Sequence, residues 1–321
     1  MTVRVSQEVR KHAGRQKLSD DVRRILQQDT TLPVFSSTAL KLIDAANRVD
    51  LDMGTIAEIV KLDPGLTTKY LKLANSVWFR GRSIMSVEDA LIRIGLREVR
   101  RLASTIGVMD VLSLFRTGTR GRPINPRIEV EWEMFWLHSI LTARLTECLA
   151  ASYRAVVGKE YLAGLLHDVG KLFMGRYFHP QFESAMAHAL EKGCSLFEAE
   201  EELFDTTHAE IGWALCEKWR LHPEVTRSIR LHHKPTSDSP LNQDAADREF
   251  QHFLAVCLHV ANALANMCNA NIQGARSPEE IDPESLPEWR LFRKYTPRGE
   301  LELDVVAELQ KAQEAIQILI V

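Results

Sequence analysis

Apolar residues recur every three to four positions along most of the chain, which is the spacing of an amphipathic α-helix. In residues 65–76, for example, Leu66, Tyr70 and Leu73 fall on one helical face. No stretch alternates apolar and polar residues persuasively over the length of a β-strand. The pattern therefore predicts an all-α fold.

Several expected helix ends are marked by residues that cap or break helices. Ser19 and Ser86 are typical N-caps, and the helix after Ser86 is expected to end near Gly95. Thr207, three residues before a glutamate, is typical of a capping box, and Pro223 is typical of a first helical turn. These signals predict short helices joined by tight turns.

The same pattern divides the chain into five parts. Their composition suggests a polar, basic and mobile arm, a helical subdomain, an Arg-rich linker, a second multi-helix domain and a C-terminal helical extension. In that order they span residues 1–18, 19–115, 116–130, 131–270 and 271–321. The last twenty residues predict one amphipathic helix, whose apolar face must pack on the body of the protein or on another chain.

The amino-acid composition argues against several classes of protein. With 45% hydrophobic and 26% charged residues and a net charge of −3, the chain is typical of a globular protein and not of a dedicated nucleic-acid binder. Its five cysteines form no CxxC pair, which argues against a disulfide framework or a thiolate zinc site and favours a reducing cytoplasm. We expect neither a membrane span nor a secretory signal, since the first 21 residues contain no apolar segment of the kind a signal peptide needs.

Four arginines leave open the hypothesis that the chain is a helical scaffold that binds a nucleic acid or a partner protein. Arg93, Arg97, Arg100 and Arg101 are spaced as one helical face that would attract phosphate. A solvent-exposed helix face that also carries Glu98 would show the same spacing, and this interpretation is favoured over phosphate binding.

Histidines are crowded into one part of the chain. Eight of the 11 lie between positions 138 and 233, where an even distribution would place about three. His138 falls on the inward face of a predicted long helix, whereas the His167-Asp168 pair, His208 and the His232-His233 pair fall at expected helix ends. Helix ends that converge on one cavity would make a multi-ligand metal site, since imidazole offers a neutral nitrogen and aspartate neutralises cation charge.

Each histidine, considered alone, could have a purely structural role. An inward histidine such as His138 is more often a hydrogen-bonded core residue than a ligand, and a His-His pair at a helix end can simply complement the helix dipole. Five further histidines show no partner pattern and are interpreted as surface or capping groups; they are His179, His188, His222, His252 and His259. Only the ordered set favours a metal site.

That ordered set resembles the HD-type metal-dependent phosphohydrolases, with His167-Asp168 inside the sequence HDVGK. The N-terminal part is similar to one branch, the HDOD (HD-related output) domain of bacterial signal transduction, over about residues 30 to 265. The motifs that carry this similarity are Leu32-Pro33, Asp63-Pro64-x-Leu66, Leu73-Ala74-Asn75-Ser76 and Ala90-Leu91-x-x-Ile94-Gly95.

The resemblance implies an HD-like domain over residues 131–270 that holds a divalent metal such as Fe, Mn, Zn or Mg. It makes Asp168 the bridging ligand and Lys171 the residue that faces substrate phosphate. The implied ligands are His138, His167 and Asp168 at a first site, His208, His232 and His233 at a second, and Asn262 at the closing position.

Three departures from the family pattern favour a degenerate site. Active members carry an aspartate where this chain has Asn262, whose neutral oxygen is a poorer ligand. Met134 stands where a glutamate would precede His138 by one helical turn, and the sequence after His233 lacks the GYP stretch that goes with cyclic-di-GMP hydrolysis.

The sequence thus favours a signalling output module with little or no catalysis. It would act by binding a partner protein or a nucleotide, such as a cyclic dinucleotide. The alternative is an active metal-dependent phosphohydrolase that acts on a nucleotide or cyclic dinucleotide. The absence of HExxH, GxSxG, GxGxxG and P-loop motifs argues against zincins, serine hydrolases, dinucleotide-binding enzymes and P-loop enzymes.

Overall fold

The computed structural model of the chain describes residues 16–28, 32, 41, 43, 53–61, 64–75, 83–116, 127–152, 156, 158–235, 245–272, 282–294 and 303–320. Within these ranges the fold is all-α, as predicted, and the one extended pairing is an isolated bridge between Gln16 and Phe204.

The described helices follow one another along the whole chain. They are α2 (Ser19–Gln28), α4 (Met53–Lys61), α5 (Pro64–Ala74), α6 (Val87–Ile94), α7 (Leu96–Arg116), α8 (Arg127–Ala151), α9 (Lys159–Leu166), α10 (Val169–Tyr177), α11 (His179–Lys192), α12 (Leu196–Leu203), α13 (His208–Lys218), α14 (Pro223–Leu231), α15 (Ala245–Ile272), the 3₁₀ turn η3 (Pro283–Ser285), α16 (Pro287–Phe292) and α17 (Val305–Ile320).

Most of the predicted helix ends are confirmed. The Ser86 hydroxyl accepts a hydrogen bond from the third residue of α6, and Gly95 ends that helix with a positive φ of 80°. The Thr207 hydroxyl caps α13 in the same way, and Pro223 is the first residue of α14. Ser19 differs, because it is already inside α2 and its hydroxyl donates to Asp205 at 2.6 Å.

Other boundaries also differ from the prediction. Helix α8 begins at Arg127, inside the expected linker of residues 116–130, and the short helix α16 lies within the predicted C-terminal extension. Most of the linker lies outside the described residues.

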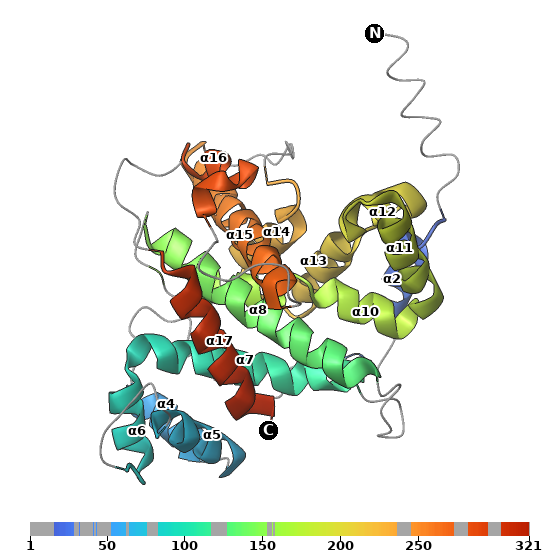
Figure 1. Cartoon of the computed structure of the whole chain (residues 1–321). Helices are drawn as coiled ribbons and strands as arrows, with labels where there is room; N and C mark the ends of the chain where they lie inside the picture. Colours follow the sequence, from blue (N-terminus) through green and yellow to red (C-terminus); the bar gives the residue numbers. More distant parts are fainter. Residues whose placement is uncertain are drawn as a thin grey trace.

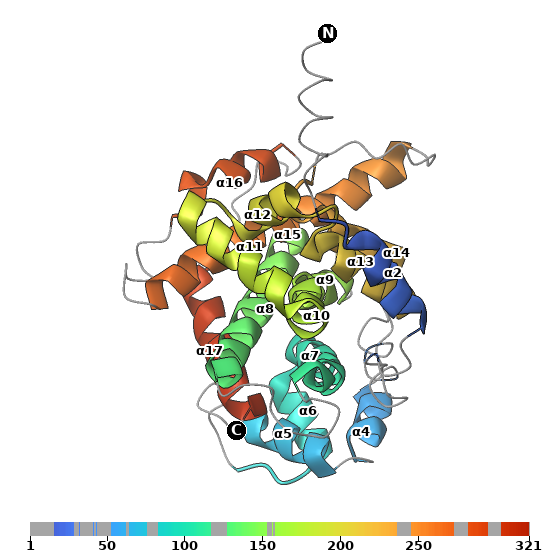
Figure 2. The ribbon, with the colours of Figure 1, turned by 90° about the vertical axis from the view of Figure 1, so that its right-hand side faces the viewer.

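Two groups of helices are joined by α8 and α17. Helices α4 to α7 form the lower part of the molecule in Figures 1 and 2, and α9 to α16 surround the upper part of α8. Helix α8 packs most extensively against α9 and α15, and its fully buried side chains include Trp136 and Leu141. Helix α17 runs along α8 and also contacts α5, so the predicted C-terminal helix packs on the body of the protein.

The end of the predicted N-terminal arm is fixed to the body. The Asp205 carboxylate accepts hydrogen bonds from the backbone N–H groups of Leu18 at 2.7 Å and Ser19 at 3.0 Å. The Leu18 side chain is 2% exposed. Residues 16–18 are therefore part of the folded domain, and residues 1–15 of the predicted arm lie outside the described part.

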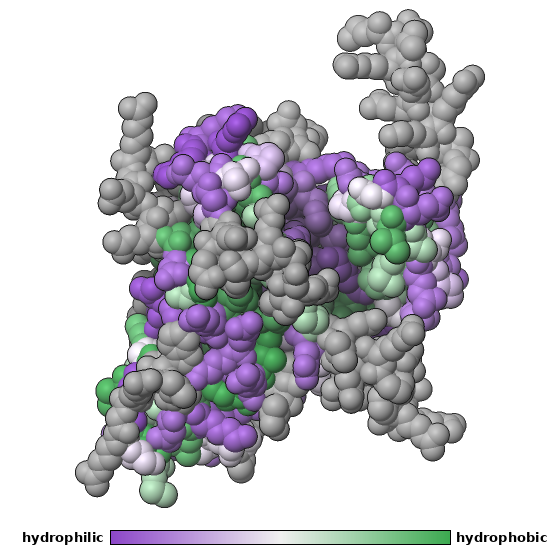
Figure 3. Space-filling model, in the orientation of Figure 1, coloured by the Kyte–Doolittle hydropathy of each residue, from purple (hydrophilic) through white to green (hydrophobic). Residues whose placement is uncertain are grey.

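The surface gives no support to a four-arginine face. Gly95 separates α6 from α7, so Arg93 stands on a different helix from Arg97, and the Arg101 side chain is buried in ion pairs. Figure 3 shows a face of mixed hydrophilic and apolar surface, with one apolar patch over α11 and α12. On α11, Met186 and Leu190 are exposed. Among the described helices, none is long and apolar enough to span a bilayer.

Candidate metal centre

The six residues predicted to ligate metal at the two sites meet at the centre of the upper helices. They come from the interior of α8, the junction of α9 with α10, the start of α13 and the end of α14. Within the described part of the chain, their potential ligand atoms form two groups, each with all atoms within 4.8 Å of one another; the groups are His138, His167 and Asp168, and Asp168, His208, His232 and His233. Asp168 belongs to both.

The shared carboxylate divides its two oxygens between the groups. Asp168 Oδ2 lies 3.2 Å from His167 Nε2 and 3.6 Å from His138 Nε2. Asp168 Oδ1 lies 3.4 Å from His208 Nε2 and 3.8 Å from His232 Nε2. This is the arrangement expected of a carboxylate that bridges two cations.

Two glycines make the junction between α9 and α10 fit its neighbours. A Cβ on Gly164 would lie 2.4 Å from the Cα of Ala143, so α9 approaches α8 backbone to backbone. A Cβ on Gly170 would lie 1.9 Å from the carbonyl oxygen of His208, so α10 approaches α13 equally closely. The His167-Asp168 pair between these glycines is thereby held against α8 and α13, two of the three helices that supply its partners.

Hydrogen bonds fix which ring nitrogen of three histidines can ligate. Nδ1–H of His167 donates to the Gly164 carbonyl at 2.6 Å, and Nδ1–H of His232 donates to the Ile229 carbonyl at 2.7 Å. Nδ1–H of His208 donates to a carboxylate oxygen of Glu200 at 2.7 Å. Because each Nδ1 carries the proton, each Nε2 presents its lone pair to the centre.

Burial sets the charge states of the same residues. Burial, with the nearby His167, lowers the pKa of His138 to about 3, and burial also holds the pKa of His232 well below its ordinary value. Burial would raise the pKa of Asp168, but His167 and Lys171 outweigh it and keep that pKa well below the ordinary value. Neutral imidazoles and an ionised carboxylate are the forms that bind metal.

Two ligand atoms lack any hydrogen-bond partner among the described residues. They are Asp168 Oδ1 and His232 Nε2, and both are buried. Leaving a buried polar atom unpaired is costly, and a divalent cation between these atoms would satisfy both. The residues present therefore fit a metal centre.

Sequence reasoning missed two residues that support the centre. Glu200 on α12 is fully buried, and its carboxylate accepts both the backbone N–H of His208 at 2.8 Å and the ring Nδ1–H. The Phe197 ring stacks on His233 with 4.3 Å between centroids. Glu200 stands in a run of glutamates, EAEEE, and only the fold distinguishes it from the other glutamates, which are half-buried or exposed.

Three other predicted positions lie beside the two groups. Lys171 Nζ donates to Asp168 Oδ2 at 2.6 Å, so the expected phosphate-facing lysine is ion-paired with the shared carboxylate. Asn262 is buried, contacts His138 by a side-chain hydrogen bond, and accepts one from the Asn266 amide at 3.3 Å. Met134 is half-buried on α8.

The five other histidines that the structure describes lie outside both groups. His222 caps α14, and Nδ1–H of His259 donates to the His232 carbonyl at 2.7 Å. His179 and His188 pair with glutamates, and His252 is half-buried.

The amino-acid sequence is similar to a known family and to a curated relative. The family model of the HDOD domain matches residues 32–235. An uncharacterised protein of Treponema pallidum (strain Nichols) is 25% identical over 290 residues, which make up 89% of this chain and 50% of that protein. The chain thus spans about half the length of this curated relative.

Solved structures share the fold. An HDOD domain protein of unknown function from Geobacter sulfurreducens is 26% identical with a TM-score of 0.66, and the match covers 93% of this chain and 96% of that one. A protein of Marinobacter aquaeolei VT8, provisionally described as a signal transduction protein, is 22% identical with a TM-score of 0.62 over 96% of this chain and 62% of that one.

Proposed function

The chain belongs to the HDOD family, and on that premise we propose that it is a signal-transduction module whose HD-type centre binds two divalent metal ions. Its output would pass through a bound partner protein or nucleotide, with little or no hydrolysis. The observation that carries the proposal is the meeting of six of the seven predicted ligands in two groups around Asp168.

The donor set favours some metals over others. Five imidazole nitrogens and one carboxylate surround the centre. Imidazole suits Zn and Fe, whereas Mg prefers oxygen ligands. Among Fe, Mn, Zn and Mg, we therefore propose Fe or Zn as the bound ions.

The charge balance argues against efficient hydrolysis. Two divalent cations would face one carboxylate, because Asn262 and Met134 bring no negative charge to the positions where active members carry acids. Lys171 adds a further positive charge beside Asp168. Weakly neutralised ions are held less tightly, which suits a sensing role better than turnover.

A second candidate function is phosphohydrolysis. Lys171 is half-exposed while its ammonium group lies beside the shared carboxylate, so it would meet an anionic phosphate that approaches the centre. Bound metal ions would supply Lewis-acid stabilisation and an activated water. The substrate class would be a nucleotide or cyclic dinucleotide.

The decisive measurement is metal content with matched variants. We expect about two Fe or Zn ions per chain in protein purified without oxygen. His167→Ala and His208→Ala should each remove about one ion, and Asp168→Asn should weaken both. His188→Ala, a histidine outside the centre, serves as the control and should leave the content unchanged.

Turnover assays then separate the two candidates. The metal-loaded protein is incubated with cyclic-di-GMP and with bis(p-nitrophenyl) phosphate. Negligible hydrolysis supports the signalling module, whereas rapid hydrolysis that is lost in His167→Ala supports the phosphohydrolase and contradicts the first proposal. A protein that holds no metal as isolated and takes up none on soaking contradicts both.

A further inference from the structure

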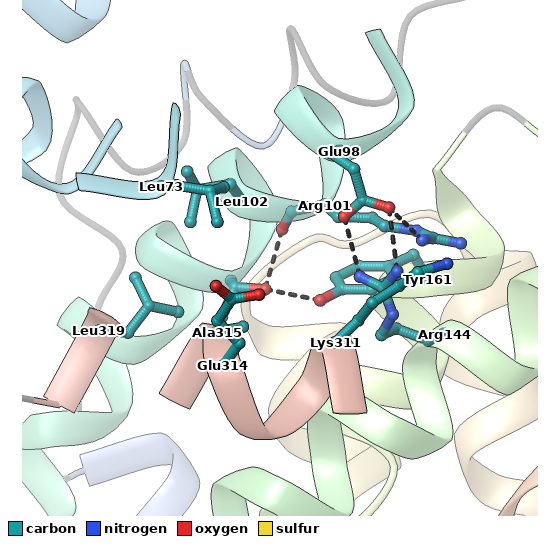
Figure 4. Close-up of a pocket in the computed structure, with 11 residues that line it drawn as sticks. Leu73, Glu98, Arg101, Leu102, Arg144, Tyr161, Lys311, Glu314, Ala315 and Leu319 are labelled. Carbon is teal, nitrogen blue, oxygen red and sulfur yellow. Dashed lines mark hydrogen bonds and ion pairs between the residues drawn. The ribbon is translucent and has the colours of Figure 1, made fainter. Parts of the chain in front are cut away.

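A cavity of about 280 Å³ lies where α17 meets the lower and upper helices. It is lined by α5 and α7 on one side, by α17 on the other, and by residues of α8 and α9 at its base (Figure 4). Its apolar walls are formed by Leu73, Leu102, Ala315 and Leu319. None of the lining residues belongs to the metal centre.

One end of the cavity is lined by charged side chains, and its cations are all ion-paired. The guanidinium of Arg144 binds Glu98 at 2.8 and 3.0 Å and Glu308 at 2.5 Å. Arg101 binds Glu98 and Glu147, and Lys311 binds Glu308 at 2.9 Å. Three cations thus face these three carboxylates, and Glu314 of α17 adds a further carboxylate to the lining, so this end offers no unmatched positive charge to an anionic ligand.

A hydroxyl pair at the base leaves one hydrogen-bond acceptor for a ligand. The Thr105 hydroxyl lies 2.8 Å from the Arg101 carbonyl, which can only accept, so Thr105 donates its single proton there. The Tyr161 hydroxyl, 2.8 Å from Thr105, must then donate to the threonine oxygen. A lone pair on the Tyr161 oxygen remains, and Figure 4 shows that hydroxyl among the lining residues.

Burial keeps this phenol protonated. It raises the pKa of Tyr161 to about 12, so the side chain is neutral throughout the physiological range. Its oxygen therefore accepts a hydrogen bond as a neutral group. A ligand with an N–H or O–H donor complements it, whereas an anion does not.

We propose that this cavity is a binding site for a small, neutral and mainly apolar molecule that donates one hydrogen bond to the Tyr161 oxygen. Ligand pockets combine apolar walls with a few placed polar groups, and they are frequent where domains meet. The volume is nearly twice that of an apolar cavity of about 150 Å³ that binds benzene, so a molecule of two fused rings is the matching size.

The site is placed to act on the junction between the two groups of helices. Helix α17 supplies one wall and also packs on α5 and α8. A ligand that fills the cavity contacts all of these helices only while α17 is docked. Binding therefore favours the docked arrangement by its differential affinity for that state.

The test uses 2-naphthol, which has an O–H donor, and 2-methoxynaphthalene, in which a methyl group replaces that proton. Titration of the full chain by ligand-observed NMR and calorimetry should show saturable 1:1 binding of 2-naphthol. The methoxy compound should bind about 3- to 10-fold more weakly, which is the usual net effect of one neutral hydrogen bond. Tyr161→Phe should lower the affinity for 2-naphthol by a similar factor and abolish the difference between the probes.

A matched pair of variants on α17 locates the site. Ala315→Phe fills the cavity and should lower the 2-naphthol affinity at least about tenfold. Ala307→Phe makes the same change at a half-buried position of α17 that does not line the cavity, and it should bind like the wild type. The proposal is overturned if 2-naphthol does not bind saturably, if Ala315→Phe binds it as well as Ala307→Phe does, or if Tyr161→Phe still distinguishes the two probes.

Discussion

Gly170→Ala is expected to separate α10 from α13 and to break one half of the metal centre. The added Cβ would stand 1.9 Å from the His208 carbonyl oxygen and 2.9 Å from the Gly212 nitrogen. These are backbone atoms of a helix, so no side chain can rotate away to relieve the contact.

The required displacement follows from the contact distance. Ordinary van der Waals contact begins at 3.4 Å, so the 1.9 Å contact demands about 1.5 Å of separation between the helices. Forced overpacking of this kind costs about 1–3 kcal/mol of the free energy of unfolding. The same movement takes His208, now 3.4 Å from Asp168 Oδ1, out of the second ligand group.

Urea unfolding and metal analysis measure the two effects separately. Gly170→Ala should lose about 1–3 kcal/mol of unfolding free energy and the ion at the His208 group, while the ion at His138 and His167 remains. Gly175→Ala is the matched control on α10, because a Cβ there meets open space. It should be neutral or up to about 1 kcal/mol more stable, since alanine favours helix. If Gly170→Ala matched this control in both measurements, the close approach of α10 to α13 would not position the centre.

Three further changes test separate contacts. Glu200→Gln should weaken metal binding at the His208 group about 10-fold or more, because losing the carboxylate that orients a metal-bound histidine usually has an effect of this size. Calorimetric titration with Zn²⁺ would detect the change, and an unchanged affinity would contradict the orienting role of Glu200. Asn262→Asp should tighten binding by about tenfold or more, roughly 1.4 kcal/mol, in the same titration, because a charged ligand replaces a neutral one, and weaker binding would refute this reasoning. Burial opposes ionisation of Glu98, but Arg144 and the neighbouring guanidinium lower its pKa from 4.5 to about 2. The ionised Glu98 carboxylate therefore stabilises the fold fully above pH 4.5, and this stabilisation is lost as the pH falls toward 2. Urea unfolding should show that Glu98→Gln is less stable than the wild type by up to roughly 3 kcal/mol above pH 4.5 and that the difference closes as the pH falls toward 2. A difference that stays constant over this range would contradict the reasoning.

Local signals predicted the framework of the fold well. Ser86, Thr207 and Pro223 act within one turn of their helix ends, so their effect can be read from neighbouring residues. The six candidate ligands could be predicted because each stands at a recognisable place in its helix and their order along the chain resembles a known family. The structure brings all six together.

Long-range partners could not be predicted in the same way. Glu200 meets His208 because the turn between α12 and α13 folds back, and nothing in a run of glutamates marks the buried one. The burial of Arg101 depends on Glu147 of another helix, so its spacing alone suggested a solvated face. Leu18 was assigned to a mobile arm because its binding partner, Asp205, lies 187 residues away.

The position of Asp168 has a thermodynamic consequence for a chain that binds two ions. Cations that share one carboxylate compete for its charge, so the first ion to bind lowers the affinity for the second. Such linkage is reciprocal, whichever group fills first. The centre would then show negative cooperativity and fill gradually over a wide range of metal concentrations. A graded response of this kind reports how much metal is available, and two independent sites of equal affinity would do so over a narrower range.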